Sequence, residues 1–137
     1  MGILSRIFGE KKEEEETIQA IEEDLLKLKI KTKAEMIAIF GVGGRLKGLP
    51  LIYAADDDPA LKQFSARLYE LIEPIKFLSE NRTLRDFVIN YYDSILFYKQ
   101  ILPNIGFFAI LRDKEDILTV KEWVYKKESV LKELLHK

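Results

Sequence analysis

The stretch MIAIFGVGGRLKGLPLIYAA, residues 36–55, contains two short apolar runs on either side of a glycine-rich segment. Residues 36–40 and residues 49–55 each have the length of a β-strand, whereas an isolated α-helix usually needs a longer run. Four glycines lie within residues 41–48, where a tight connection needs positive φ angles that glycine adopts easily. We therefore predict a β-hairpin over residues 36–55.

A segment with helical periodicity precedes this hairpin. The apolar residues that share one face of it are Ile18, Ile21, Leu25 and Leu28. Their spacing predicts a helix with Thr17 as its N-cap and an end near residues 31–33.

A second helical segment follows the hairpin, and Asp58 and Pro59 are suited to its N-cap and first helical position. Its apolar stripe consists of Leu61, Phe64, Leu68, Leu71, Ile75 and Leu78. Pro74 lies within this stripe and predicts a kink, because proline removes a backbone donor and clashes with the preceding turn. We expect this helix to end within residues 79–82.

Three strand candidates and a last helix complete the chain. The strands are residues 84–92, 95–101 and 105–111, and the first two are joined by a two-residue turn, Asp93 and Ser94. The last helix spans residues 117–135. Its buried stripe is predicted to consist of Val120, Trp123, Val124, Leu131 and Leu134.

These elements predict an α+β fold in the order α-β-β-α-β-β-β-α, with a five-stranded antiparallel sheet flanked by helices. The strands at 36–40 and 105–111 are apolar on both faces and should be central. Pro50 places the strand at 49–55 at an edge or makes it a strand start. The predicted order across the sheet is 49–55, 36–40, 105–111, 95–101 and 84–92.

The strand at 84–92 forms the second edge of this sheet and has no proline. Its side chains are typical of β-strands and include Phe87, Val88, Ile89, Tyr91 and Tyr92. An unprotected edge of this kind is a template for pairing with another chain. We expect it to pair with a second copy in a homodimer. The alternative is a monomer whose edge is covered by a loop or by the N-terminal helix.

Residues 1–16 differ in composition from the domain predicted over residues 17–137. The apolar residues Ile3, Leu4, Ile7 and Phe8 fall on one helical face, and an acidic run, residues 13–16, follows them. We interpret residues 1–16 as an amphipathic peptide and a charged linker. Three alternatives remain open for the peptide: it lies in a membrane interface, docks in a partner's groove, or is disordered.

Composition excludes several function classes. The 137 residues are 47% hydrophobic and 33% charged, which is typical of one globular domain. Lysine and arginine total 22 against 23 acidic residues, so the chain lacks the basic excess of nucleic-acid-binding proteins. There is no cysteine, and the single histidine, His136, is penultimate. These absences exclude disulfides, cysteine nucleophiles and histidine triads, and they favour a non-catalytic binding domain without a cofactor.

The sequence gives weaker indications of the protein's cellular location and source. No apolar segment approaches the length that spans a bilayer, and no signal peptide is recognisable. We therefore expect a cytoplasmic protein, with a peripheral membrane position if the N-terminal peptide binds lipid. Lysine and glutamate dominate the charged residues while glutamine and asparagine are scarce, a bias typical of many thermophile proteins.

Three local motifs have a functional and a structural interpretation. Gly43 and Gly48 have the separation of a phosphate-binding loop, but a strand follows them, which favours a hairpin turn. Residues 56–58 are three aspartates that could bind a cation, although helix capping and solvation are the simpler interpretation. Four aromatic residues, Tyr91, Tyr92, Phe97 and Tyr98, are expected to cluster across the last hairpin, in cross-strand packing or at a dimer surface.

The element order and several short sequence motifs resemble those of the roadblock/dynein light chain family. The second strand contains GLPLI (residues 48–52), an acidic loop opens a long helix over residues 56–78, and the last strand begins near NIGF (residues 104–107). The chain departs from the family in its glycine-rich first turn, in Pro74 and in the additional residues 1–16.

The resemblance implies a homodimer or heterodimer with a continuous ten-stranded sheet. It also implies a non-catalytic regulator or scaffold for a small Ras-like GTPase. The expected contact surface is the exposed side of the second helix, with Lys62, Arg67 and Glu70. The alternative function is a sensory or trafficking module of PAS, GAF or longin type. A sensory module would need an internal cavity, which Phe40, Phe107 and Phe108 would fill. An enzyme would need a cleft with clustered charges.

Overall fold

The computed structural model describes residues 18–78, 80 and 82–136 in full, and for residues 3–17 it gives the helical backbone alone. The elements in chain order are α1 (Ile3–Thr32), β1 (Met36–Gly41), the 3₁₀ turn η1 (Gly44–Leu46), β2 (Pro50–Ala55), α2 (Asp58–Leu78), β3 (Asp86–Asn90), β4 (Ile95–Leu102), β5 (Ile105–Leu111) and α3 (Asp116–Leu135). The predicted order of helices and strands, and with it the α+β fold class, is confirmed.

Helix α1 begins at Ile3, so the prediction that the first helix begins after Thr17 was wrong. Glutamate and lysine are good helix formers, and the charged run between the two apolar parts continues the helix. The helix ends at Thr32, as predicted, and Lys33 follows with a φ of 56°, the left-handed conformation common just after a helix. The side chains of residues 1–17 lie outside the described residues. The division of the chain at residue 16 therefore stays a prediction.

The five strands form one antiparallel sheet in the order β2-β1-β5-β4-β3, as the sequence predicted. Strands β1 and β5 are central and pair with each other along their full length, from Met36 opposite Ile110 to Gly41 opposite Ile105. Both are almost entirely buried, because helices cover both faces of the sheet at this point. Strands β2 and β3 form the two edges.

The hairpin between β1 and β2 has the glycine conformations that the sequence predicted. Gly44 and Gly48 have φ angles of 66° and 76°. Gly41 is required for a different reason: a Cβ at this position would lie 1.9 Å from the carbonyl oxygen of Leu46. The loop folds back closely on the end of β1, and no helix follows it, so its geometry is that of a strand connection.

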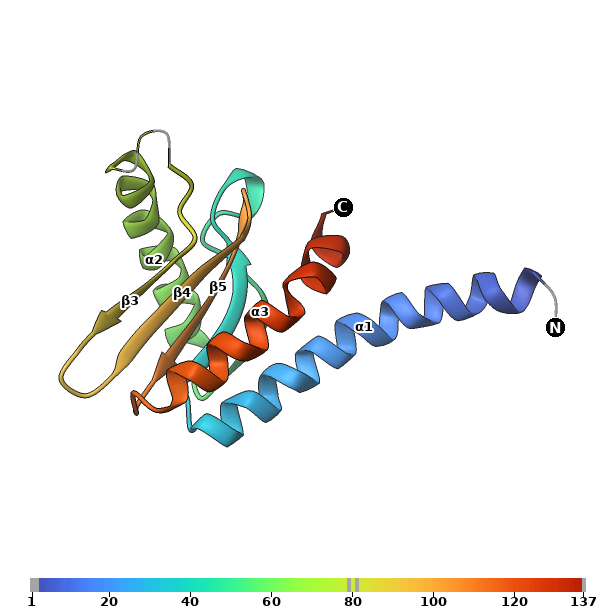
Figure 1. Cartoon of the computed structure of the whole chain (residues 1–137), viewed down its shortest axis with the longest axis horizontal. Coiled ribbons are helices and arrows are strands. Elements are labelled where there is room, and N and C mark those ends of the chain that lie inside the picture. The colour runs from blue at the N-terminus through green and yellow to red at the C-terminus, as the bar shows by residue number, and fades with distance from the viewer. Residues whose placement is uncertain (1–2, 79, 81, 137) are drawn as a thin grey trace.

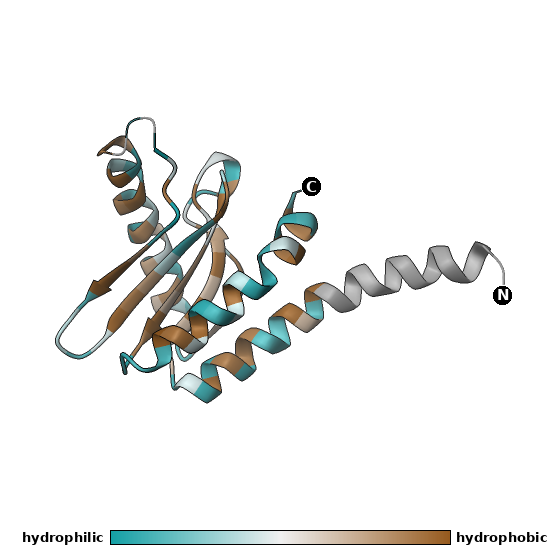
Figure 2. Ribbon diagram, viewed as in Figure 1, coloured by the Kyte–Doolittle hydropathy of each residue, from teal (hydrophilic) through white to brown (hydrophobic). Residues whose placement is uncertain are grey.

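Helices α1 and α3 cover one face of the sheet, and α2 covers the other (Figure 1). On the first face, α1 lies against β1 and β2, while α3 lies against β4 and β5. On the second face, α2 lies against β1 and β2, which leaves the β3 side of this face less covered. Hydrophobic and hydrophilic residues alternate around α3 and around the described part of α1, whereas the strands are mostly hydrophobic (Figure 2).

Two apolar cores result, one on each face. Phe97 and Phe107 lie in the core beneath α1 and α3, with their rings 6.2 Å apart. Phe40 and Phe108 lie in the core beneath α2, with their rings 5.0 Å apart and edge-on. Burying each of these side chains contributes about 1.5–3 kcal/mol to stability. The sheet is therefore filled with aromatic rings on both sides.

Strand β3 is shorter than predicted, and the turn that follows it is placed differently. It ends at Asn90, which pairs with Ile95, so Tyr91 and Tyr92 lie beyond the strand. The N–H of Tyr91 donates to the carbonyl of Ser94 (2.8 Å). This bond closes the turn around Tyr92 and Asp93, one residue earlier than the predicted pair Asp93 and Ser94.

The start and the buried stripe of α2 also differ from the prediction. The side chain of Asp57, not that of Asp58, caps the helix by accepting a hydrogen bond from the N–H of Ala60 (3.1 Å). The helix includes Pro74 and continues to Leu78. Its buried residues are Leu61, Ser65, Leu68 and Ile72. The residues of the predicted stripe are on average closer together than the helical period of about 3.6 residues. Successive members therefore turn progressively around the helix and away from the sheet.

Candidate interaction surface

The outer edge of β3 has no partner strand within the part of the chain that the structure describes. Phe87, Val88 and Ile89 are each half-buried, because one side of the strand packs and the other is open. Phe87 and Ile89 contact the core beneath α2, and Val88 contacts the core beneath α3. The strand is thus held firmly by the sheet while its outer backbone groups remain available.

Two backbone hydrogen bonds determine which groups of β3 face the open edge. Tyr91 bonds Ser94, as above, and the N–H of Gln100 donates to the carbonyl of Arg85 (2.8 Å). In an antiparallel pair, residues that bond the neighbouring strand alternate with residues that face away from it. The residues of β3 that direct their N–H and C=O groups outward are therefore Asp86, Val88 and Asn90.

The aromatic cluster predicted across the last hairpin does not form. Tyr92 is fully exposed at the turn, and Tyr91 is more than half exposed. Phe97 and Tyr98 are neighbours in β4, so they point to opposite faces of the sheet and lie in different cores. The aromatic pair that does cross the hairpin is Phe87 with Tyr98, with stacked rings 4.9 Å apart.

The two flanks of α2 face different parts of the sheet. The ring of Phe64 lies 5.2 Å from the ring of Phe108 in β5. By contrast, the backbone of Ala66 lies against Gly48, in the loop that leads into β2. Because β5 lies between β1 and β4, the Phe64 flank is the one nearer to β3.

The flank of α2 nearer to β3 carries exposed apolar side chains. Helical spacing places Leu71 and Leu78 on the same flank as Phe64. Leu71 is 42% exposed and Leu78 is 84% exposed, and the adjacent Phe77 is 82% exposed. Large apolar side chains grouped in this way indicate a contact surface more often than single exposed ones. They lie on the face of the sheet to which Phe87 and Ile89 point.

Lys62, Arg67 and Glu70, the residues expected to contact a partner, are all exposed on α2. None of them forms an ion pair with another described residue, so their charged groups are available to a partner. Arg67 is on the apolar flank with Leu71, whereas Lys62 is on the opposite flank. The three residues therefore span the outer surface of the helix, and their role in binding stays a prediction.

Polar contacts tie the β3 side of the sheet to α3. The hydroxyl of Tyr125 donates a hydrogen bond to Asp86. Lys99, whose side chain is only 2% exposed, places its ammonium 3.1 Å from Glu128 and 4.5 Å from the centre of the Tyr125 ring. Burial and the hydrogen bond to Asp86 raise the pKa of Tyr125 to about 12. Asp86 and Lys99 thus each have a partner on α3.

The carboxylate of Glu128 forms ion pairs with two lysines. Lys99 lies 3.1 Å away and Lys132 lies 3.2 Å away. Burial alone raises the pKa of Glu128, but the hydrogen bonds from the two lysines outweigh it and hold the pKa below its ordinary value. The carboxylate is therefore ionised at neutral pH and compensates the buried charge of Lys99.

The opposite edge has a different ion pair. Lys29 of α1 bonds Asp56, which follows β2, and this hydrogen bond lowers the pKa of Asp56. Asp57 caps α2 and Asp58 is its first residue, so the three aspartates have separate structural roles. Within the described residues, no group of three or more histidine, cysteine, aspartate or glutamate side chains is placed to hold a metal ion.

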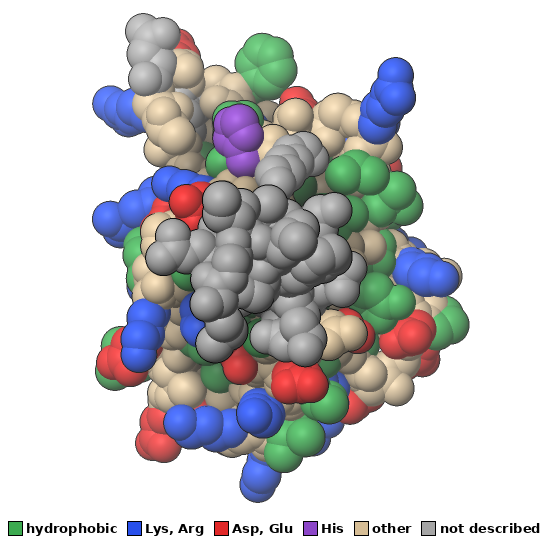
Figure 3. All heavy atoms as spheres, turned by 90° about the vertical axis from the view of Figure 1, so that its right-hand side faces the viewer, with side chains coloured by type: hydrophobic (Ala, Val, Ile, Leu, Met, Phe, Trp, Pro, Cys, Tyr) green, Lys and Arg blue, Asp and Glu red, His purple; other side chains and the backbone are tan. Residues whose placement is uncertain are grey.

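The side chains of Ile3, Leu4, Ile7 and Phe8 lie outside the described residues, and their membrane or partner role stays a prediction. A search of the described residues finds no helix that is both long and apolar enough to cross a membrane. Around the end of the molecule that faces the viewer in Figure 3, basic and acidic side chains are interspersed with hydrophobic ones. This mixture agrees with the net charge of −1.

Sequence patterns did not reveal two features of this surface. The first is the contact of Lys99 with Glu128, which are 29 residues apart and belong to different elements. The second is the apolar flank of α2, because Leu71 and Leu78 were assigned to the buried stripe. Counting the stripe with the true helical period would have moved both leucines toward the surface.

Comparisons with known proteins show the fold. No model of a known protein family matches the sequence, and no curated protein matches it either. The structure is similar to the Roadblock/LC7 domain from Streptomyces avermitilis, with 10% identity over 76% of this chain and 87% of that chain and a TM-score of 0.66. MglB of Myxococcus xanthus is similar with 9% identity over 85% of this chain and 91% of that chain and a TM-score of 0.71.

A further MglB structure, described as having a tetrameric arrangement, shares 12% identity over 84% of this chain and 88% of that chain, with a TM-score of 0.66. At these identities the similarity establishes the fold alone. The chain has the roadblock fold.

Proposed function

We propose that this chain is a non-catalytic, dimeric interaction domain that regulates or holds a small Ras-like GTPase. Two copies pair through the outer edges of their β3 strands and form a continuous ten-stranded sheet. The exposed surfaces of the two α2 helices then lie on one side of the dimer and bind the partner.

The observation that carries the proposal is the open edge of β3. Three of its residues direct hydrogen-bonding groups outward, and the strand carries neither proline nor lysine, the usual means of protecting an edge. In a single copy these groups bond water, and pairing with a second copy would replace that water with a further rung of the backbone ladder. A two-fold axis at the centre of β3 would bring the same residues of both copies together.

The apolar flank of α2 supports the same dimer. Leu71 and Leu78 are on the side of the helix nearer to β3, so a second sheet joined at this edge would bring another α2 beside them. Contact between the two helices would remove these side chains from water. A structural neighbour with a tetrameric arrangement supports self-association in proteins of this fold.

The partner is inferred from the resemblance to the roadblock family and from the surface of α2. Lys62, Arg67 and Glu70 provide both signs of charge without internal partners, which suits recognition by charge complementarity. The competing sensory-module hypothesis needs an enclosed cavity. Aromatic rings instead occupy the core on each face of the sheet, including Phe40, Phe107 and Phe108, all fully buried.

Titration of the full chain with Ras-like GTPases from the same organism tests this function. Each GTPase is loaded with GDP or with a non-hydrolysable GTP analogue, and binding is measured by calorimetry. We expect one nucleotide state to bind preferentially. Arg67→Glu should weaken binding by about tenfold, since buried arginines often dominate interfaces.

Lys126→Glu is the matched control, because it makes the same charge reversal at an exposed position of α3, on the other face of the sheet from α2. The control should bind as the wild type does. Absence of binding to every GTPase in both nucleotide states would refute the GTPase part of the proposal, while the dimer would be judged separately from the mass of the particle in solution.

A further inference from the structure

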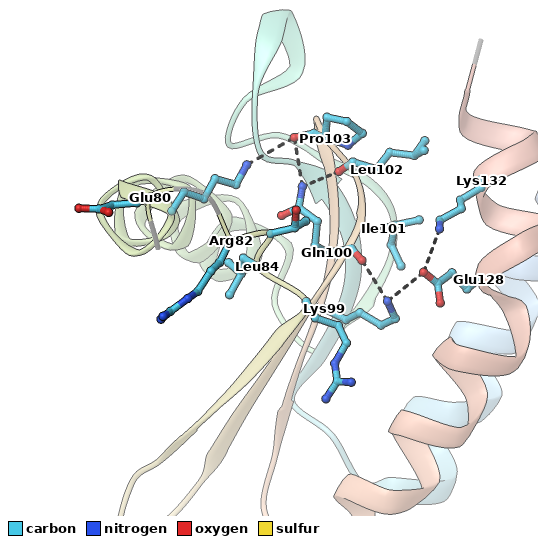
Figure 4. A pocket seen from close by; sticks show the side chains of 13 residues that line it. Glu80, Arg82, Leu84, Lys99, Gln100, Ile101, Leu102, Pro103, Glu128 and Lys132 are labelled. Carbon is cyan, nitrogen blue, oxygen red and sulfur yellow. Dashed lines mark hydrogen bonds and ion pairs between the residues drawn. The ribbon is translucent and has the colours of Figure 1, made fainter. Parts of the chain in front are cut away.

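A hollow of about 570 Å³ opens beside the C-terminal end of α2, whose Lys76 belongs to its lining (Figure 4). It is bounded by the segment that leads into β3, by the turn between β4 and β5, and by α3. Its volume is in the range of about 300–1,000 Å³ that is usual for small-molecule sites. The proposed dimer and its GTPase do not require this hollow.

Positive charge predominates in the lining of the hollow. Its cationic side chains are Lys76, Arg82, Arg85, Lys99 and Lys132, and its carboxylates are Glu80 and Glu128. In Figure 4 the carboxylate of Glu80 points away from Lys99 and Lys132, while the ammonium groups of these two lysines both point toward Glu128. Glu128 is therefore the carboxylate that competes with a ligand for these cations.

Several donors near Glu128 remain available. The ammonium of Lys132 has three N–H groups and, among the described residues, bonds only Glu128, and its side chain is half exposed. Arg85 bonds Asp86 through Nε alone, so its terminal N–H groups have no partner among the described residues. Lys99 is fixed by Glu128 and by the carbonyl of Gln100 (3.1 Å). A buried, fixed cation and two freer ones thus border the same space.

The wall beside these cations is apolar. Ile101 is buried, Leu84 and Leu102 are half-buried, and Pro103 is exposed at the turn. The turn itself is held by Gln100, whose side-chain N–H groups donate to the carbonyls of Leu102 (2.6 Å) and Pro103 (3.1 Å). The hollow therefore combines an apolar surface with a cluster of cations on a well-fixed frame.

We propose that this hollow binds a small organic phosphate of nucleotide size. The phosphate groups accept hydrogen bonds from Lys132 and Arg85, whose planar guanidinium suits phosphate oxygens. The buried charge of Lys99 adds attraction at short range. The organic part lies on the wall formed by Leu84, Leu102 and Pro103.

Calorimetric titration of the full chain with ATP tests this site, with adenosine and inorganic pyrophosphate as separate probes. We expect saturable binding of ATP, with weaker binding of each half of the molecule. Lys132→Glu should weaken ATP binding by about tenfold or more, because it removes a donor and adds a repelling charge. Lys126→Glu makes the same charge change at an exposed position of α3 outside the hollow and should change binding less than about twofold.

Three outcomes would overturn the proposal. They are no saturable binding of ATP up to about 1 mM, equal weakening by both variants, and equal affinity for ATP and pyrophosphate. Equal weakening by both variants would indicate general electrostatic attraction. Equal affinity for ATP and pyrophosphate would indicate that the apolar wall does not contribute to binding. Circular dichroism of both variants establishes that each is folded, so a loss of binding reports on the site.

Discussion

The two edges of the sheet are protected to different degrees. Edge strand β2 begins with Pro50, which has no N–H to offer, and α1 lies against it. Edge strand β3 has no proline, α2 lies nearer to the far side of the sheet, and the strand's outward N–H and C=O groups face no other strand among the described residues. Both edges are short, yet only β2 also has a proline and a helix packed against it.

The difference is the basis of the proposed dimer. When one edge of a sheet is protected and the other is open, further strands can be added only at the open edge. Near each edge an ion pair joins the sheet to a helix. Lys99 of β4, the neighbour of β3, pairs with Glu128 of α3, and Asp56, just after β2, pairs with Lys29 of α1, where the carboxylate is more exposed.

Proline at the centre of β3 should have the largest effect. Val88→Pro removes an outward-facing donor while leaving the bonds between β3 and β4 in place. The substitution is present in both copies, so the dimer loses two ladder bonds and leaves their acceptors unpaired, at about 1–3 kcal/mol each. We therefore expect the dimer to weaken by about 100-fold. Analytical ultracentrifugation over a concentration series measures the change.

Two controls accompany this variant. Val88→Thr keeps the N–H and the branched shape and should leave the dimer nearly unchanged. Ala55→Pro makes the matching change at the other edge: the N–H of Asp56 donates to Glu35 (3.1 Å), so its neighbour Ala55 faces outward from β2. If Ala55→Pro dissociated the dimer and Val88→Pro did not, the assignment of the edges would be wrong.

Glu128→Gln should destabilise the fold by about 2 kcal/mol at pH 7, because Lys99 then keeps a buried charge without its carboxylate. The lowered pKa of Glu128 means that its contribution is fully present above the ordinary glutamate pKa of about 4.3 and is lost as pH falls through the folded value. Urea unfolding of wild type and variant should therefore converge in acid. A difference that persisted unchanged at pH 3 would contradict the ion-pair assignment.

A charge on the apolar flank of α2 should weaken the dimer more moderately. Leu71→Glu replaces a partly exposed apolar side chain that the proposed dimer buries, so we expect about a tenfold loss of affinity. The fold should tolerate the change because the residue is 42% exposed in one copy. Gln63→Glu, on the outer side of the same helix, is the control, and equal weakening by both variants would argue against helix contact in the dimer.

Asp56→Asn at the β2 edge should have the smallest effect. The lowered pKa of Asp56 gives stability above the ordinary aspartate range that is lost as pH falls, but the pair with Lys29 is open to solvent. We expect less destabilisation than for Glu128→Gln, and added salt should reduce it further. Thermal unfolding in low and high salt measures both effects. A loss as large as that of Glu128→Gln would mean that the two edges are tied equally.

Most of the fold could be predicted from short-range patterns. The apolar runs that became β1 and β5 identified the centre of the sheet, because only strands covered on both faces are apolar throughout. Pro50 identified one edge, and the glycines of residues 41–48 identified the hairpin. These signals are contained in neighbouring residues, so no knowledge of the tertiary structure was needed to interpret them.

The candidate surface was harder to predict. It depends on which side of a helix each residue faces and on contacts between residues far apart in the sequence. A stripe counted at slightly too short a spacing placed Leu71 and Leu78 in the core, although both are exposed. Asp57 and Asp58 are equally suitable caps in sequence, and only the path of the loop decides between them. The pairing of Lys99 with Glu128 depends on where α3 crosses β4.

Amide hydrogen exchange within β3, measured by NMR at high protein concentration, tests the central claim most directly. The N–H of Ile89 already bonds β4, whereas the N–H of Val88 faces outward and is protected only if a second copy pairs there. We predict that the two amides exchange with similar protection. Rapid, unprotected exchange at Val88 beside a protected Ile89 would contradict pairing through this edge.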